Sequence, residues 1–365
     1  MKLFIKLFKL LVNIKYNLLK GFLRKKNRIV FLSRQSDHLS DDFKMIMAGL
    51  KGYDIKYICI RDDGDIISKI KLIIYSLKSI TILAGSKVCV LDSYWPGVSL
   101  LKNKNFKVIQ IWHALGKIKK SGYQTLDKSS GRDLKTSKAM DMHRNYDIVV
   151  AGGKAWNKYY CESFNIDEGI IRNYGLPRID RMLDNKGKYI NEVYEKYPEL
   201  SSKPILLYAP TFRRGYYADW YDLLDEIDTD KFHLVIKAHP NSPLDFDTSK
   251  FYNCNDVTTE MLLAACEYLI TDYSAIAIEG ALLDKKTYYY IFDYEEYISS
   301  NGLNLLINEE YPKLCFKDAK SLANQLNKGE YPYEVFENYK ERFLPSELGN
   351  STKKIIEMIE AYMKE

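Results

Sequence analysis

Several apolar segments of this 365-residue chain end in side chains that could move a proton or bind a diphosphate. The sequence IQIWHALGKIKKSG places His113 at the end of one such segment, with three lysines shortly after it. Because the ordinary pKa of histidine lies near neutral pH, His113 is suited to general-base catalysis. The alternative is a structural histidine satisfied by backbone hydrogen bonds, beside lysines in a solvated loop, and an isolated histidine favours this alternative.

Two segments in the second half of the chain supply positive charge. In LLYAPTFRR, an apolar run leads to the hydroxyl of Thr211 and then to Arg213, whose guanidinium offers bidentate donors to a phosphate. In LVIKAHP, Lys237 and His239 lie two residues apart and therefore on one face of an extended chain. A cation and a histidine in this position suit a diphosphate, because its leaving phosphate gains charge in the transition state. For the first segment, the alternative is a turn with surface arginines.

The sequence YLITDYSAIAIEGALLDKKTYYY predicts a βαβ unit with a possible anion site. The expected elements are a strand at Tyr268–Thr271, a helix at Ala275–Leu283 and a strand at Thr287–Ile291. Ser274 and Ala275 would lie at the helix N-terminus, where free N–H groups and the helix dipole favour a phosphate. Glu279 would follow about one helical turn later and could accept hydrogen bonds from ribose hydroxyls. A serine at a helix start is, however, often no more than a cap.

These segments must be positioned by strands that alternate with helices, a pattern that predicts an α/β fold with parallel, doubly wound sheets. In the first half, the predicted strands are Arg28–Ser33, Asp54–Ile60, Lys87–Leu91, Phe106–Trp112 and Asp147–Val150, with a helix at Ile66–Leu77. The pattern restarts with strands at Pro204–Tyr208 and Phe232–Ile236, after a polar stretch at Asp184–Lys203 that we interpret as the interdomain region. We therefore expect two Rossmann-like domains that face a cleft, at residues 28–190 and 200–345, and a closing helix at 346–365.

Charge and cysteine usage limit the function classes. The net charge is +6, but Met1–Arg28 holds nine of the Lys and Arg residues and no acid, so the rest of the chain is about −3. No basic groove for nucleic acid is indicated. The six cysteines lack metal-binding spacing and suit a cytoplasmic protein with reduced thiols, several of them buried, such as Cys59, Cys89 and Cys266. Asp62-Asp63-Gly64-Asp65 is interpreted as a turn and not as a magnesium site.

The first 27 residues predict an amphipathic helix. Leu3, Leu7, Leu10, Ile14 and Leu18 recur at helical spacing opposite a basic and polar face. The segment carries too many charges to span a bilayer and lacks a signal-peptide cleavage site. We expect it to lie on an anionic membrane surface, where each Lys or Arg contributes on the order of 1 kcal/mol. The alternative is a helix that packs on the first domain with a solvated basic face.

The motifs WHALGKIKK, GLPRID, YAPTFRR, IKAHP and TDYSAIAIEGALLDKKTYYYIFDYEEY occur together in this order. In this the chain resembles the CDP-glycerol glycerophosphotransferase family, the teichoic-acid primases and polymerases with their ribitol-phosphate and capsule relatives, over about residues 106–300. The resemblance implies a GT-B fold and metal-independent transfer, without a cofactor, of glycerol phosphate or ribitol phosphate from a CDP-polyol, with release of CMP. The acceptor would be a hydroxyl of a prenyl-diphosphate-linked glycan or polyol-phosphate polymer, on the cytoplasmic face of the membrane.

The resemblance also implies roles for individual residues. His113 would be the base, and His239 would help to hold the donor phosphates. The implied donor-binding residues are Trp112, Ala114, Leu115, Gly116, Arg178, Pro210, Thr211, Arg213, Lys237, Ala238, Ser274, Ala275 and Glu279. Three of these positions depart from the commonest family pattern, since Ala114 and Ala275 replace Gly and Ser, and Glu279 replaces Asp.

Two other functions are compatible with the same fold. A GT-B glycosyltransferase that uses a nucleotide sugar in surface-polysaccharide synthesis would share the diphosphate site. A membrane-tethered interaction protein with a degenerate site is the other, although the retention of His113, Lys237, His239 and Glu279 together argues against it. The residues do not distinguish glycerol from ribitol or a primase from a polymerase, and they do not identify the polymer or the oligomeric state.

Overall fold

The computed structural model describes residues 2–128, 131–211, 213, 221–237 and 251–365. The described chain divides into two compact units. Unit 1 contains residues Met1–Ala114, Ser121–Asp180 and Pro345–Glu365, and unit 2 contains Leu115–Lys120 and Arg181–Leu344. The chain therefore enters unit 2 for a short segment directly after His113 and Ala114 and then returns to unit 1. It enters unit 2 a second time at Arg181 and returns to unit 1 for its last helix.

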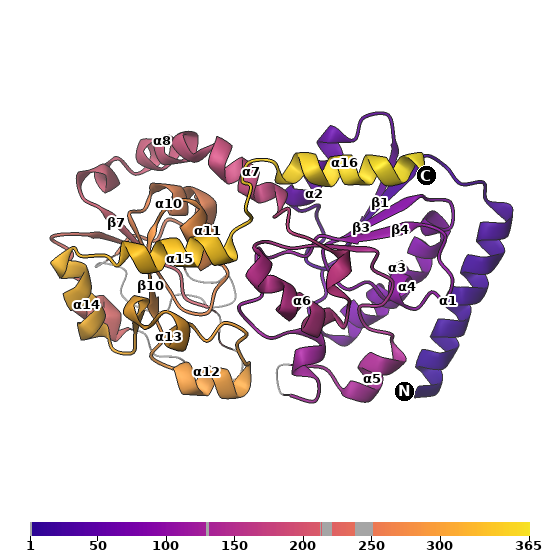
Figure 1. Ribbon diagram of the computed structural model, residues 1–365, viewed down its shortest axis with the longest axis horizontal. Helices are drawn as coiled ribbons and strands as arrows, with labels where there is room; N and C mark the ends of the chain where they lie inside the picture. Colours follow the sequence, from indigo (N-terminus) through magenta and orange to yellow (C-terminus); the bar gives the residue numbers. More distant parts are fainter. Residues whose placement is uncertain (1, 129–130, 212, 214–220, 238–250) are drawn as a thin grey trace. The chain divides into compact units, whose positions relative to one another are not determined.

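Over the described residues, unit 1 contains a six-stranded parallel sheet in the order β2-β1-β3-β4-β5-β6 (Figure 1). Its strands are β1 (Arg28–Ser33), β2 (Asp54–Cys59), β3 (Val88–Leu91), β4 (Lys107–Gln110), β5 (Ile148–Val150) and β6 (Ile171–Arg172). Its helices are α1 (Lys2–Phe22), α2 (Asp41–Gly49), α3 (Ile66–Leu83), α4 (Pro96–Ser99), α5 (Leu134–Ala139), α6 (Asn157–Phe164) and α16 (Ser351–Lys364). Helix α7 (Pro177–Asp184) begins in unit 1 and ends in unit 2.

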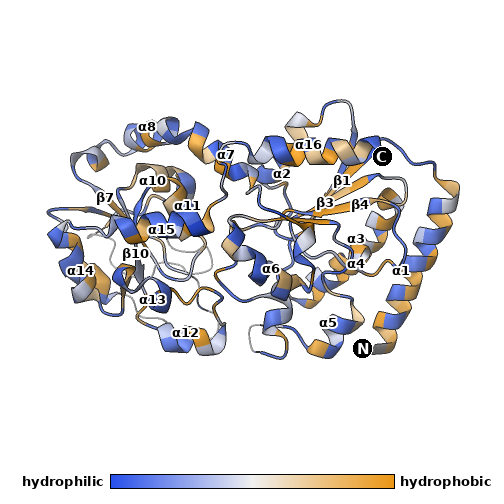
Figure 2. Cartoon of the chain, viewed as in Figure 1, coloured by the Kyte–Doolittle hydropathy of each residue, from blue (hydrophilic) through white to orange (hydrophobic). Residues whose placement is uncertain are grey.

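The core of unit 1 forms around β1 and β3, whose apolar residues are buried on both faces. Val30 and Leu32 pair in register with Cys89 and Leu91 and are fully buried, each contributing about 1.5–3 kcal/mol of hydrophobic stabilisation. Figure 2 shows these strands as the most hydrophobic part of the unit. Such continuous apolar runs are typical of parallel strands covered by helices on both faces.

Helix α1 packs on this core through one stripe, in which Phe8, Val12 and Tyr16 are buried. A second apolar stripe faces away from the core, and its residues are about half exposed or more: Leu3, Phe4, Leu7, Leu10, Leu11, Ile14, Leu18 and Phe22. The helix thus combines tertiary packing with an exposed apolar surface. None of the helices in the described part of the chain has the length and apolar content needed to cross a membrane.

Unit 2 contains a parallel sheet in the order β11-β10-β9-β7-β8, five strands as far as its described residues go (Figure 1). These strands are β7 (Ile205–Tyr208), β8 (His233–Ile236), β9 (Tyr268–Thr271), β10 (Lys286–Tyr290) and β11 (Cys315–Phe316). The helices are α8 (Lys186–Lys196), α9 (Asp222–Glu226), α10 (Thr259–Ala265), α11 (Ile276–Leu282), α12 (Tyr294–Ser300), α13 (Ile307–Glu310), α14 (Ala319–Lys328) and α15 (Tyr333–Phe343). Two parallel sheets with helices confirm the predicted α/β class.

Several predicted elements differ from those observed. The polar stretch at Asp184–Lys203, expected to join two domains, forms α8, which packs against α10 inside unit 2. Helix α3 continues to Leu83, six residues beyond its predicted end, and helix α16 belongs to unit 1. Of the thiols expected to be buried, Cys89 and Cys266 are buried and Cys59 is half-buried, and all are free.

Candidate active-site residues at the strand ends

The predicted site residues of each unit follow the carboxyl ends of its strands, where parallel sheets bind ligands. In unit 1, His113 lies three residues after β4, which ends at Gln110, earlier than predicted. The intervening Trp112 has a φ of 61°, in the left-handed region, and its N–H donates to Gln110 Oε1 at 2.9 Å. A non-glycine residue in this conformation is uncommon and occurs most often at functional turns. This turn redirects the chain so that His113 follows a tight corner.

A backbone contact fixes the tautomer of His113. Its Nδ1 lies 3.0 Å from the carbonyl oxygen of Asp92, directly after β3. A carbonyl oxygen only accepts hydrogen bonds, so Nδ1 of the neutral ring carries the proton and Nε2 keeps its lone pair. The Trp112 ring lies against the imidazole, with 4.1 Å between ring centroids. His113 is half-buried and oriented as a general base requires, with Nε2 as the basic atom.

The segment that follows His113 belongs to unit 2 from Leu115 to Lys120. The carbonyl of Ala114 accepts from Tyr160 in unit 1 at 3.2 Å. Asn304 then donates to the carbonyls of Lys117 and Lys119 at 2.8 and 3.2 Å. Leu115, Gly116 and Lys117 are buried, and burial lowers the pKa of Lys117 well below its ordinary value. The lysines of this loop are therefore not simply a solvated face.

Arg178, at the start of α7, is held by a buried acid of unit 1. Its backbone N–H and Nε donate to Asp42 at 2.8 and 2.9 Å, and Nη2 lies 2.5 Å from Asp42 Oδ2. Asp42 lies in the first turn of α2 and is 3% exposed. Arg178, predicted to bind the donor, thus has one edge of its guanidinium committed to a carboxylate.

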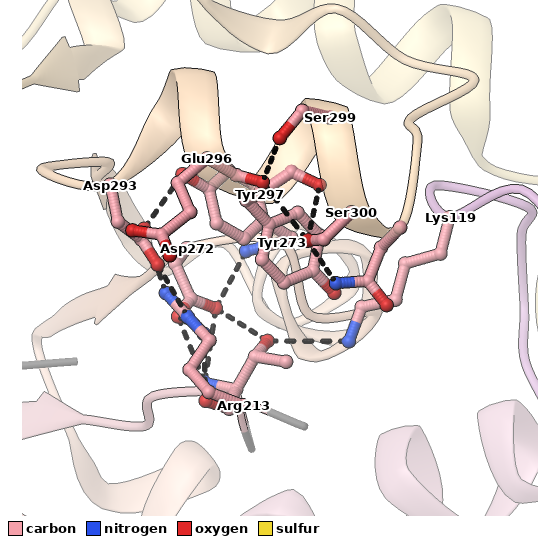
Figure 3. A network of polar contacts seen from close by, with 11 residues as sticks. Lys119, Arg213, Asp272, Tyr273, Asp293, Glu296, Tyr297, Ser299 and Ser300 are labelled. Atoms are coloured by element: carbon pink, nitrogen blue, oxygen red, sulfur yellow. Dashed lines mark hydrogen bonds and ion pairs between the residues drawn. The ribbon is translucent and has the colours of Figure 1, made fainter. Parts of the chain in front are cut away.

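In unit 2, Asp272 binds the turn that contains Thr211 and, as Figure 3 shows, lies beside Arg213 and Tyr273. This acid directly follows β9 and is 1% exposed. The backbone N–H of Thr211 donates to both oxygens of Asp272, at 3.1 and 2.9 Å, and the Thr211 hydroxyl donates to Oδ1 at 2.5 Å. The N–H of Tyr273 donates to the same oxygen at 2.6 Å. The position of Thr211 is therefore set by a buried carboxylate on the neighbouring strand.

Arg213 is enclosed by the same cluster. Its Nε and Nη2 donate to Asp293 at 2.6 and 3.0 Å, and its Nη1 donates to Asp272 at 2.8 Å and to the Thr211 carbonyl at 2.7 Å. Burial alone would lower the pKa of Arg213, but the two carboxylates raise it. Its guanidinium also lies 5.2 and 5.0 Å from the ring centroids of Tyr273 and Tyr297. The guanidinium N–H groups of Arg213, which were predicted to bind a phosphate, donate to these carboxylates and to the Thr211 carbonyl in this structure.

Lys119 connects the loop after His113 to this cluster within unit 2. Its ammonium lies 3.4 Å from the Thr211 hydroxyl and 5.7 Å from the Tyr297 ring centroid (Figure 3). Tyr297 in turn stacks on Tyr273 at a centroid distance of 3.9 Å. Lys119 was noted in the sequence only as one of three loop lysines. The structure brings it to the hydroxyl that was predicted to contact the donor.

The remaining predicted residues of unit 2 lie after β8 and in or just before α11. Lys237, after β8, donates to the carbonyls of Cys254 and Val257 at 3.2 and 2.9 Å, and burial lowers its pKa. Ala238 and His239 lie outside the described residues. Ser274, Ala275 and Glu279 are half-buried around the start of α11, where the Ser274 hydroxyl accepts weakly from the N–H of Ile276 at 3.4 Å.

Sequence reasoning missed the acids that hold these residues. Asp42, Asp272 and Asp293 carry the arginines, yet each lies many residues from its partner, 136 in the case of Asp42 and Arg178. Asp272 could have been found from its position in the sequence, because it directly follows an apolar strand. In the described ranges, no group of three or more His, Cys, Asp and Glu residues is arranged to hold a metal ion.

Residues 14–361 match the sequence profile of CDP-glycerol:poly(glycerophosphate) glycerophosphotransferases. The chain belongs to this family. The resemblance inferred from the five motifs is thereby confirmed, and the match extends well beyond residues 106–300, over nearly the whole chain.

Relatives of this glycerophosphotransferase family member include primases and polymerases. The teichoic acid ribitol-phosphate primase of Bacillus spizizenii is 28% identical over 373 residues, covering 95% of each chain. The teichoic acid glycerol-phosphate primase of Bacillus subtilis is 26% identical and covers 79% of this chain and 77% of its own. The poly(ribitol-phosphate) polymerase of Bacillus spizizenii is also 26% identical, but the match spans 56% of that longer protein.

Solved structures confirm the fold of this family member. The wall teichoic acid polymerase TagF superposes with a TM-score of 0.72 at 19% identity, covering 97% of this chain and 94% of that chain. The UDP-GlcNAc 2-epimerase of Neisseria meningitidis superposes with a TM-score of 0.55 at 12% identity. The architecture is the GT-B fold, as predicted.

Proposed function

We propose that this protein transfers glycerol phosphate or ribitol phosphate from a CDP-polyol to a hydroxyl of a lipid-linked teichoic-acid or capsule polymer and releases CMP. Membership of the glycerophosphotransferase family supports the reaction class. The observation that carries the chemistry is the contact between His113 Nδ1 and the Asp92 carbonyl, because it leaves Nε2 as a base.

The step balances without a redox partner. His113 Nε2 accepts the proton of the acceptor hydroxyl while its oxygen attacks the polyol-bearing phosphorus of the donor. A new P–O bond forms, the bond between this phosphorus and the bridging oxygen breaks, and the electron pair leaves on CMP. Positioning and charge stabilisation are the main contributions that a protein makes to such a transfer.

Unit 2 supplies the donor site in this proposal. Thr211, Lys119, Lys237 and the N–H groups around Ser274 and Ala275 meet the phosphates, together with His239, and Glu279 accepts from the ribose. Arg213 acts through Thr211, because its own donors are on Asp272 and Asp293. Neutralisation comes from these groups without a metal ion, so CMP release should persist in excess EDTA.

The exposed apolar stripe of α1 supports a peripheral location on an anionic membrane surface. Helix α3 packs beside α1 and also exposes apolar residues, Ile66, Ile67, Ile70 and Ile74. Apolar side chains flanked by the basic residues of 1–27 match the composition of interfacial helices. The purified protein should therefore sediment with vesicles that contain anionic lipid, and less with neutral vesicles. Equal binding to both would argue against the electrostatic part of this proposal.

The decisive experiment is a donor panel with the purified protein and a prenyl-diphosphate-linked acceptor. CDP-glycerol or CDP-ribitol should yield CMP and a lengthened product, whereas consumption of a sugar nucleotide alone would contradict the proposal. His113→Asn should lower kcat about 100- to 10,000-fold, as expected for loss of a general base. His38→Asn is the matched control, because His38 is exposed. Full activity of the His113 variant would exclude it as the base.

A further inference from the structure

Two arginines of unit 1 lie against a single tyrosine ring. The guanidinium carbon of Arg34, directly after β1, is 5.3 Å from the ring centroid of Tyr94, and that of Arg132 is 5.6 Å from the same centroid. Tyr94 is buried, and its hydroxyl donates to the Met140 carbonyl at 3.1 Å. We call Arg34 and Arg132 the arginine pair.

The positive charge of the arginine pair is only partly neutralised. Arg34 is 13% exposed, and its Nη1 lies 3.1 Å from Asp62 Oδ2, whereas its Nε has no hydrogen-bond acceptor in the described part of the chain. Arg132 forms no ion pair with any residue that the structure describes. Burial lowers the pKa of Arg34, and the charge of Arg132 lowers it further against the effect of Asp62. The nearby Asp141 already pairs with Arg144 and Lys9.

Packing alone does not explain this arrangement. One arginine on a tyrosine ring is a common and modestly favourable contact. The guanidinium of Arg132, an exposed residue, adds like-charge repulsion to the largely buried Arg34. An anionic ligand in contact with both guanidinium groups would relieve this repulsion.

Hydrogen bonds connect Arg34 to His113 through the turn after β3. The backbone N–H of Arg34 donates to the Ser93 hydroxyl at 2.9 Å. Gln110, at the end of β4, donates to the Ser93 carbonyl at 3.1 Å. The preceding residue, Asp92, accepts from the ring of His113. Arg34 and the basic nitrogen of His113 thus belong to the same carboxyl edge of one sheet, and Arg132 reaches Arg34 through the Tyr94 ring, within unit 1.

We propose that Arg34 and Arg132 bind the phosphodiester of the acceptor, the anionic group nearest to the hydroxyl that His113 deprotonates. This inference rests on the proposed function, which assigns the hydroxyl to unit 1 and the CDP-polyol to unit 2. A growing polyol-phosphate chain carries a phosphodiester a few bonds from its terminal hydroxyl. Guanidinium groups match its oxygens in geometry and charge. A neutral glycan end would offer the arginine pair no anion. A nucleotide would offer it an anion other than the phosphodiester next to the reacting hydroxyl.

The test compares two synthetic acceptors that end in the same glycerol unit, one through a phosphodiester and one through a neutral linkage. Arg132→Gln should raise the KM for the phosphodiester acceptor about 10- to 100-fold, the effect of one lost charge-assisted contact. The KM for the CDP-polyol and the KM for the neutral acceptor should change less than about threefold, because neither substrate loses a charge-assisted contact. Arg61→Gln is the matched control, because Arg61 is an exposed arginine after β2 of the same sheet.

A second variant and a binding measurement separate the outcomes. Arg34→Lys keeps the positive charge but loses the planar guanidinium that can donate two parallel hydrogen bonds. It should therefore raise the acceptor KM less than Arg132→Gln does. An unchanged acceptor KM in both variants, or equal effects on both acceptors, would overturn the site while leaving the reaction intact. If the wild-type protein released no CMP with either acceptor, the proposed function would fail instead. Calorimetry with glycerol phosphate then decides the site: binding that Arg132→Gln abolishes supports it, and binding that the variant retains overturns it.

Discussion

The two units place the same pair of residue types at corresponding strand ends, with opposite results. In unit 1, Asp92 follows β3 and Arg34 follows the neighbouring β1. In unit 2, Asp272 follows β9, and Arg213 lies shortly after the neighbouring β7. Both acids are almost fully buried, with 2% and 1% of their surface exposed. Asp272 forms an ion pair with Arg213, whereas Asp92 forms no ion pair with any described residue.

The difference separates a structural clamp from a binding site. Arg213 meets two carboxylates, so its charge is more than neutralised and every nitrogen donates inside the protein. Such a group holds a turn in place and has little left to offer a ligand. Arg34 meets one carboxylate among the described residues, and its Nε has no hydrogen-bond acceptor there, so this donor remains for a ligand. An arginine near a strand end is therefore informative only together with the acids around it.

The largest effect should come from removing the clamp. Arg213→Met leaves the carboxylates of Asp272 and Asp293 buried without a cation, which should lower the free energy of unfolding by about 3–5 kcal/mol. Urea denaturation measures the loss. The control is Arg342→Met, which removes an arginine that is 43% exposed and paired with Glu310 and should cost about 1 kcal/mol or less. Equal losses in the two variants would mean that burial of the Arg213 cluster does not increase the free-energy cost of removing its arginine.

Much of the fold was predictable because its strands are short apolar runs bounded by polar residues. The bounds of β1 and β9 agree with the predicted Arg28–Ser33 and Tyr268–Thr271 residue for residue. Helix α2 was missed because its nine residues follow a polar turn and provide too few apolar positions for a clear period. Its start is marked only by the cap, in which the Ser40 hydroxyl accepts from the N–H of Phe43.

The site was predictable in its positions but not in its contacts. Apolar runs that end in His113 and Thr211 indicated strand ends, and both residues lie just beyond strands. The partners could not be read from the sequence, since Thr211 and Asp272 are 61 residues apart and only the order of the strands brings them together. The same holds for Arg34, which shares Tyr94 with a residue 98 positions later in the chain. The roles of the remaining site residues stay predictions.

A smaller effect should come from Asp92, the unpaired counterpart of Asp272. Burial raises its pKa to about 6, against the opposing effect of the Ser33 and Ser93 hydroxyls. The folded state therefore holds the proton more tightly than the unfolded chain does. Stability should fall as the pH rises from about 4 to about 6, and the penalty should stay constant at higher pH.

Asp92→Asn removes this penalty, so it should raise the free energy of unfolding at pH 7.5 by up to about 3 kcal/mol. The gain should shrink toward zero as the pH falls below about 4, because the wild-type carboxyl is then protonated in both states. Urea denaturation across this range measures the difference, with the exposed acid Glu334 changed to Gln as the control. A gain that does not depend on pH would show that ionisation of Asp92 is not its source. A loss of stability at pH 7.5 would point instead to lost favourable interactions of the ionised carboxylate with the Ser33 and Ser93 hydroxyls.

The smallest effect on stability should come from a substitution of Arg34. This prediction distinguishes the strand end of Arg34 most clearly from that of Arg213. Arg34→Met keeps much of the apolar contact with Tyr94 and removes a repulsive neighbour of Arg132. It also removes the cation paired with Asp62, whose side chain is 15% exposed in the wild-type protein. These effects oppose each other, so the free energy of unfolding should fall by about 1–2 kcal/mol, less than in Arg213→Met, where two carboxylates lose their cation. Inorganic phosphate should raise the melting temperature of the wild-type protein by binding the folded state, and should raise that of the variant less. A loss as large as that of Arg213→Met, with the phosphate effect intact, would make Arg34 a second clamp rather than part of an anion site.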